Sequence, residues 1–203
     1  MPMISVLERL PTKYLRLIIA CWLSASLLAL MIDQASATKP KTERPPVTIE
    51  RDAEKLPIQV AEMRDAILAA ALSGRIKELL IPIQWNELRP DFGAVNSSNP
   101  IPDFKKLSID GEGREILAIL KKLLEMPYAI VRQGRDIENN KIYVWPYVAE
   151  LPLQKLKPEQ EVELLEIIPR DSYKSMKKNG KYKYWRLTIG ADGTWHEFLQ
   201  QEP

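Results

Sequence analysis

The chain has 203 residues, of which 45% are apolar and 28% are charged, and its formal net charge is +2. This composition is ordinary for a globular protein and excludes an intrinsically disordered chain. A net charge so close to zero does not indicate nucleic-acid binding, and we expect no nucleic acid among the partners. The single cysteine excludes a disulfide within the chain.

The first 37 residues have the organisation of a secretory signal peptide. Basic residues precede an uncharged apolar run from Leu17 to Ile32, and Ala35, Ser36 and Ala37 then form a small-x-small cleavage site. We therefore predict cleavage after Ala37 and a periplasmic or secreted protein. The alternative is an uncleaved N-terminal membrane anchor, because the apolar run is long for a signal peptide. Contact with a membrane is expected only in that case.

Proline and charge dominate residues 38–55, which we predict to be a flexible tether. Residues 56–203 are then expected to form a single α+β domain. Apolar residues recur at three- and four-residue spacing up to Gly74, and a second helical segment breaks at Pro82. This spacing predicts a helical hairpin at the start of the domain.

A long loop and a third helix complete the helical half. The segment from Asn86 to Phe104 contains several prolines and is predicted to be a loop, and loops of this length often carry function. Asp110 can then cap a longer helix that stops at Pro127. The apolar stripe of this helix consists of Ile116, Leu120, Leu123 and Leu124.

The second half of the chain is rich in β-forming residues. Runs 128–134 and 141–148 predict strands on either side of an Asn139-Asn140 turn, and two short helices follow before a C-terminal hairpin. Because helices come first and strands later, we predict an α+β fold. In this fold the helical half packs against a small antiparallel sheet.

The turn sequence from Gly190 to Thr194 predicts the register of the hairpin. A three-residue loop requires Gly193 in the left-handed conformation. The resulting cross-strand pairs are Ile189 with Trp195, Leu187 with Glu197 and Trp185 with Leu199. Trp195 then faces the core, while His196 and Phe198 lie on a partly solvated outer face. A two-residue turn would instead place His196 on the apolar face.

Two surfaces are candidates for ligand binding. The C-terminal run interleaves basic and aromatic residues, which suits an anionic partner. With the outer face of the hairpin, this surface comprises Lys181, Lys183, Tyr184, Arg186 and His196. Tyr143 and Trp145 would form an aromatic recognition strip if their strand exposed them. The alternatives are a solvated charged face for the first surface and core packing for the second.

Catalysis has weaker support in the sequence. No nucleophile or orienting carboxylate stands in a recognisable pattern with His196, and one histidine without a cysteine in the mature chain does not make a metal site. We therefore predict no catalytic residue, no metal site and no cofactor. The alternative is a hydrolase of envelope polysaccharide or peptide that uses two carboxylates as acid and base. The candidate carboxylates are Asp103, Asp110, Glu112 and Glu115.

Most of the mature chain resembles known proteins. The resemblance is carried by segments 66–80, 143–169 and 184–198. They resemble a family of secreted proteobacterial proteins of unknown function. The resemblance implies an envelope location and transfers no activity and no catalytic residue. We therefore expect a non-catalytic binding or interaction module, whose partner is an anionic envelope component or a periplasmic protein.

Overall fold

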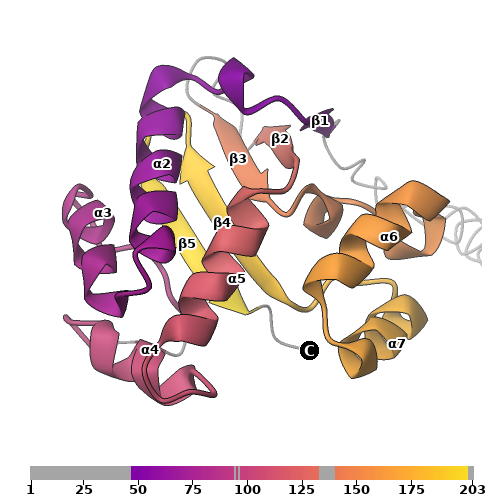
Figure 1. Ribbon diagram of the computed structural model, residues 1–203. Helices are drawn as coiled ribbons and strands as arrows, with labels where there is room; N and C mark the ends of the chain where they lie inside the picture. The colour runs from indigo at the N-terminus through magenta and orange to yellow at the C-terminus, as the bar shows by residue number, and fades with distance from the viewer. Residues whose placement is uncertain (1–46, 94, 96, 133–139, 201–203) are drawn as a thin grey trace, which may run out of the picture. The chain divides into compact units, whose positions relative to one another are not determined.

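The computed structural model describes residues 47–93, 95, 97–132 and 140–200. They form a five-stranded antiparallel sheet with the strand order β1-β2-β3-β4-β5, and helices cover one face of it (Figure 1). The strands are β1 (Thr48–Glu50), β2 (Tyr128–Arg132), β3 (Lys141–Trp145), β4 (Trp185–Gly190) and β5 (Trp195–Gln200). This architecture confirms the predicted α+β class and its C-terminal hairpin.

Two helices form the centre of the helical layer. In Figure 1, α2 and α5 lie across the same face of the sheet, with α3 and α4 on one side of them and α6 and α7 on the other. No helix of the described residues is long and apolar enough to cross a bilayer. The α-helices are α2 (Ile58–Leu72), α3 (Leu80–Gln84), α4 (Ile101–Leu107), α5 (Arg114–Leu124), α6 (Pro158–Ile167) and α7 (Arg170–Asn179). Short 3₁₀ turns are η2 (Ala53–Lys55), η3 (Ile76–Leu79), η4 (Tyr147–Glu150) and η5 (Leu153–Lys155).

The two predicted helical features are confirmed. After α2, Gly74 adopts a left-handed conformation with φ 67°, and η3 and α3 then run back along α2. Asp110 holds the start of α5, although the N-cap residue itself is Gly113, because its Oδ1 accepts the backbone N–H groups of Glu112, Gly113 and Arg114 at 3.2–3.3 Å. The predicted stripe of α5 is buried against α2 and the sheet.

The core lies between the helical layer and the sheet. Leu187 and Ile189 of β4 face it and are fully buried, as is Trp195 of β5. Phe92 joins them from the loop after α3, and its ring lies 5.3 Å from Trp195 and 5.1 Å from Phe104 in edge-on contacts. The aromatic cluster therefore fixes the long loop and α4 against the hairpin.

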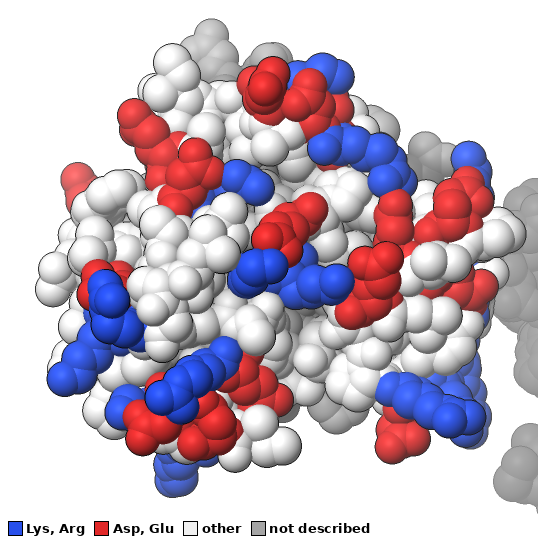
Figure 2. All heavy atoms as spheres, in the orientation of Figure 1, with Lys and Arg blue, Asp and Glu red and all other residues white. Residues whose placement is uncertain are grey.

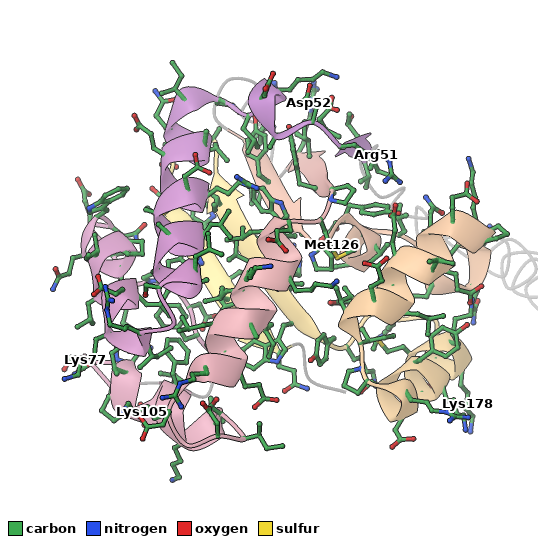
Figure 3. The ribbon with its side chains drawn as sticks, in the orientation of Figure 1. Arg51, Asp52, Lys77, Lys105, Met126 and Lys178 are labelled. Carbon is green, nitrogen blue, oxygen red and sulfur yellow. The ribbon has the colours of Figure 1, made fainter. Side chains whose placement is uncertain are left out.

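The folded part begins earlier than predicted. Residues Thr48–Glu50 lie within the predicted tether but pair with β2 as β1. Arg51 follows and binds Glu163 of α6 at 2.6 Å, and Figure 3 shows its side chain reaching toward that helix. Proline and charge content alone predicted a tether, whereas Thr48–Glu50 form a strand because they pair with the edge of the sheet.

The predicted loop from Asn86 to Phe104 is also shorter than expected. Helix α4 begins at Ile101, where Asn99 Oδ1 accepts its N–H at 3.1 Å and Pro102 occupies the first turn. Proline suits the first turn of a helix, so the prolines that suggested a loop partly mark a helix start. Asn139 of the predicted Asn139-Asn140 turn lies outside the described residues.

The hairpin loop is confirmed, but the register beyond it is wrong by one residue. Gly190 N–H donates to the Thr194 carbonyl at 2.9 Å, Gly193 has φ 86°, and Ile189 pairs with Trp195 as predicted. A β-bulge at His196 then shifts the ladder. The observed pairs are Leu187 with Phe198 and Trp185 with Gln200, in place of the predicted Glu197 and Leu199.

The bulge has a visible cause in the loop after α3. Asp91 N–H donates to the His196 carbonyl and Phe198 N–H donates to the Asp91 carbonyl, both at 2.8 Å. A short parallel contact with Asp91 therefore accompanies the extra residue in β5. As a consequence, Phe198 is buried in the core and not on the outer face as predicted. Trp195 is buried and His196 is exposed, as predicted.

Candidate functional site

The predicted aromatic strip is part of the core. Tyr143 and Trp145 are 4% and 0% exposed, and both rings pack on Tyr128, with centroids 5.9 and 5.4 Å from its ring. The pKa of the Tyr143 phenol is raised by this burial. Neither residue reaches a ligand from the surface, so the alternative of core packing holds for both.

The guanidinium of Arg186 forms ion pairs with two carboxylates. It binds Glu150 at 2.8 Å and also pairs with Glu197, and the side chain is only 14% exposed. The two carboxylates carry one more negative charge than the guanidinium carries positive charge, so the cluster is net negative. Arg186 is therefore a structural link between η4, β4 and β5 and does not offer a free charge to an anionic ligand.

The remaining predicted binding residues lie at opposite ends of β4. Lys181 is exposed and Lys183 and Tyr184 are half-buried just before this strand, while His196 lies beside its last residues. Tyr184 lines a groove between α5 and α6, and burial raises the pKa of its phenol. The structure therefore divides the predicted continuous face into a lysine-rich end and a hairpin tip.

The lysine-rich end is an ordinary charged surface near the end of α7. Lys178 points away from the other helices at the tip of α7 (Figure 3), and Lys177 is paired with Glu161 at 2.8 Å. In the face shown by Figure 2, basic and acidic side chains alternate without a broad field of one sign. Lysines in the last turn of a helix also stabilise its dipole, which accounts for their position.

The candidate catalytic carboxylates have structural roles. Ser108, together with backbone N–H groups, lowers the pKa of Asp110 to about 2. The ammonium of Lys105 lies 2.9 Å from Glu112 and lowers the pKa of that carboxyl. Asp103 accepts the Ser97 hydroxyl at 2.5 Å and Glu115 accepts the backbone N–H of Ile109 at 2.6 Å. A general acid requires a raised pKa, and the pKa values of Asp110 and Glu112 are lowered instead.

Two recesses flank the tip of the β4–β5 hairpin, and Asp192 lines both of them. The first, which we call the His196 recess, has a volume of about 260 Å³. It is lined by Asn140, Lys141, Ile142, Gly190, Ala191, Asp192 and His196. A Cβ atom on Gly190 would lie 2.7 Å from both Asp192 Oδ1 and His196 Nε2. The bare backbone of Gly190 thus provides the space in which a carboxylate and an imidazole converge.

The second, which we call the Trp85 recess, has a volume of about 200 Å³. It is lined by Gln59, Glu62, Met63, Trp85, Asn86, Asp192, Gly193 and Thr194. Trp85 is 56% exposed here, whereas Trp145 and Trp195 are fully buried. Large exposed aromatic side chains beside a polar recess are typical of binding sites.

Asn86 holds the Trp85 recess together. Its amide nitrogen donates to the carbonyl of Pro82 at 2.9 Å, and its Oδ1 accepts the backbone N–H of Trp195 at 2.8 Å. This side chain therefore ties the end of α3, and with it Trp85, to the start of β5. On the opposite wall, Gly193 packs directly against the carbonyl of Gln59 in α2. The walls come from three elements that contact one another, so the recess is formed in the unliganded fold.

Comparison of this chain with protein-family models, with curated proteins and with solved structures finds no match. The resemblance to secreted proteobacterial proteins therefore stays a prediction. Within the part of the chain that the structure describes, no three histidine, cysteine or acidic side chains gather closely enough to hold a metal ion.

Sequence reasoning singled out His196 but missed its neighbours in the recess. Asp192 and Lys141 are brought to it by the hairpin turn and by the pairing of β3 with β4. Trp85 was missed altogether. The only local signal was its position directly after the apolar segment of α3, where a helix that ends at Gln84 leaves the indole at the surface.

Proposed function

We propose that this protein is an exported binding protein that holds its ligand at the tip of the β4–β5 hairpin and performs no chemistry on it. The single observation that carries the proposal is the half-exposed Trp85 beside a preformed recess. Burying such an indole against a ligand would remove a large apolar area from water. The partner is an envelope component or a periplasmic protein, because the sequence predicts export.

The positions of the carboxylates favour binding over hydrolysis. Asp110 and Glu112 have lowered pKa values and stay ionised at neutral pH, so neither can act as a general acid. His196 and Asp192 converge over Gly190, but no serine, threonine or cysteine among the described residues lines that recess as a nucleophile. The geometry therefore supports recognition by fixed polar groups and a ring more than it supports a reaction.

Co-sedimentation of the purified protein with isolated cell envelopes tests the proposal. Removal of a central tryptophan from an interface commonly weakens binding by tenfold or more, so we expect Trp85→Ala to lose at least that much affinity. The matched control is Leu72→Ala, because Leu72 is also exposed, at 62%, but lies at the other end of α2.

A second pair of variants separates the hairpin tip from the lysine-rich end. Lys178→Glu and Lys181→Glu reverse charge near the end of α7, far from the Trp85 recess along the chain. We expect them to retain binding to envelopes. If they abolish co-sedimentation while Trp85→Ala retains it, the ligand site lies at α7 and the proposed location is wrong.

A further inference from the structure

We infer that the Trp85 recess is a site for an organic cation, a primary ammonium or a guanidinium group carried on a short apolar chain. The inference rests on the proposed function for the location of the site and goes beyond it by naming the chemistry of the ligand. The charge, the aromatic surface and the size of the recess all suit such a group.

The charge of the recess is negative. Among the residues that the structure describes, its lining includes two carboxylates, Glu62 and Asp192, and no lysine, arginine or histidine. Neither carboxylate forms an ion pair with a described residue. Arg64, close to Glu62 in the sequence, is directed elsewhere, to Asp65 at 2.7 Å and to the Leu124 carbonyl at 2.9 Å. A cation entering the recess would therefore meet uncompensated negative charge.

The aromatic surface points to the same ligand class. Indole is the ring that attracts cations most strongly through its face, and Trp85 lines the recess while 56% of its surface stays exposed. A carboxylate and an indole together bind a cation by charge, while the methylene groups next to the cation bury against the ring. An anion would be repelled by both, and a neutral ligand would gain only from burial.

Acceptors for hydrogen bonds complete the site. Asp192 Oδ1 accepts the backbone N–H of Thr194 at 2.9 Å, which fixes this carboxylate and leaves Oδ2 for a ligand. Gln59 and Thr194, whose side chains carry oxygen atoms that can accept hydrogen bonds, line the same recess. Ammonium and guanidinium groups donate hydrogen bonds and accept none, so several acceptor oxygen atoms suit them. This favours a primary ammonium or guanidinium over a quaternary ammonium, which cannot donate.

The volume limits the size of the group. About 200 Å³ is below the usual range for sites of drug-sized ligands and suits the end of one side chain or a small free amine. Met63, which is 4% exposed, also lines the recess, and a thioether side chain suits contact with alkyl carbons. The neighbouring His196 recess contains Lys141 and His196, so a cation is expected to prefer the Trp85 side.

An NMR titration of the isotope-labelled protein tests the inference. The probes are n-butylammonium and n-butylguanidinium, with 1-butanol and butyrate as neutral and anionic counterparts of the same length. We expect saturable shifts of the Trp85 indole N–H and of the Gly193 and Thr194 amides with the two cations only. Glu62→Gln should weaken cation binding about tenfold, and Trp85→Phe should weaken it less than Trp85→Leu.

The matched control is Glu159→Gln, which removes the same charge from an exposed position on α6. It should leave cation binding unchanged. This control distinguishes the effect of the Glu62 carboxylate in the recess from an effect of the net charge of the protein. Two further probes, a blocked lysine amide and a lysine-rich hexapeptide, identify the source of the cation. If the hexapeptide binds much more tightly than the blocked lysine amide, the source of the cation is a basic protein segment. If the two probes bind equally, the source is a free amine.

The inference and the proposed function fail in different ways. If butanol binds as well as butylammonium, or if Glu62→Gln changes nothing, the cation class is wrong, although Trp85-dependent binding to envelopes can still hold. If the cations bind as expected but Trp85→Ala does not affect co-sedimentation, the cation site stands and the proposed function is wrong. Absence of any saturable shift at Trp85 with either cation overturns the inference directly.

Discussion

A Cβ atom on Gly193 would lie 2.8 Å from the carbonyl oxygen of Gln59. This contact joins the hairpin tip to the first turn of α2, and it leaves no room for a side chain. Gly193 also has φ 86°, a conformation that other residues adopt only with strain. The glycine is therefore required twice, once by the turn and once by the helix that packs on it.

Replacement of this glycine should destabilise the protein. We expect Gly193→Ala to lower the free energy of unfolding by about 2–3 kcal/mol, since backbone strain and displacement of a backbone carbonyl add together. Gly74→Ala is the control, because Gly74 has φ 67° but nothing lies within 4 Å of its Cβ position. It should cost only about 1 kcal/mol. Urea unfolding of both variants measures the difference, and equal losses would show that the Gln59 contact contributes nothing.

The contact between Arg186 and Glu150 should contribute measurable stability. The two side chains are 14% and 21% exposed and lie 2.8 Å apart. A double-mutant cycle with Arg186→Ala and Glu150→Ala should give a coupling of about 1–2 kcal/mol. The same cycle on Lys122 and Glu166, which are 47% and 54% exposed, should give less than about 0.5 kcal/mol. Equal couplings would contradict a structural role for the buried pair.

Acid should weaken the cap of α5. The Asp110 carboxyl has its pKa lowered from the usual 3.8 to about 2, so its ionised form is favoured in the folded protein. This stabilisation is complete above about pH 4 and is lost as the pH falls toward 2. Asp110→Asn should therefore lower stability at pH 7 and flatten the pH dependence of unfolding between these values. The free energy of unfolding is measured by denaturant titration at each pH. If it falls with pH as steeply in Asp110→Asn as in the wild type, Asp110 does not stabilise the start of α5.

Alkali should weaken the packing of the buried tyrosines. Burial raises the pKa of Tyr128 from 10.0 to about 12, so the neutral phenol is favoured in the folded protein. The associated stability is complete below pH 10 and is lost as the pH rises toward 12. Tyr128→Phe should reduce this loss, because it removes the titrating group whose hydroxyl donates to the Asp52 carbonyl at 3.2 Å. A steeper or unchanged loss in this variant would contradict the assignment.

Local signals predicted the elements of the fold well. The left-handed Gly74 and Gly193 and the apolar stripe of α5 depend on neighbours in the sequence, and the structure contains all of them. Asp110 also binds the first N–H of α5, although the N-cap residue is Gly113. The errors arose from contacts between distant segments. The bulge at His196 accompanies pairing with Asp91, and β1 forms because a sheet edge was free to pair with it.

The candidate site could not be predicted for the same reason. The hydrogen bond from Trp195 to Asn86 that closes the Trp85 recess joins residues 109 positions apart. No spacing rule relates Glu62, Trp85 and Asp192, which reach one recess from α2, from the end of α3 and from the hairpin tip. The two carboxylate partners of Arg186 lie on η4 and β5, and no spacing in the sequence relates them to it.

Site-specific photo-crosslinking in living cells tests most directly whether the ligand lies at the hairpin tip. A benzophenone amino acid would replace Gln59 in the wall of the Trp85 recess and, in a second variant, the exposed Lys178 of α7. We predict a covalent adduct from position 59 that disappears when Trp85→Ala is added, and none from position 178. Adducts from position 178 with none from position 59 would contradict the account.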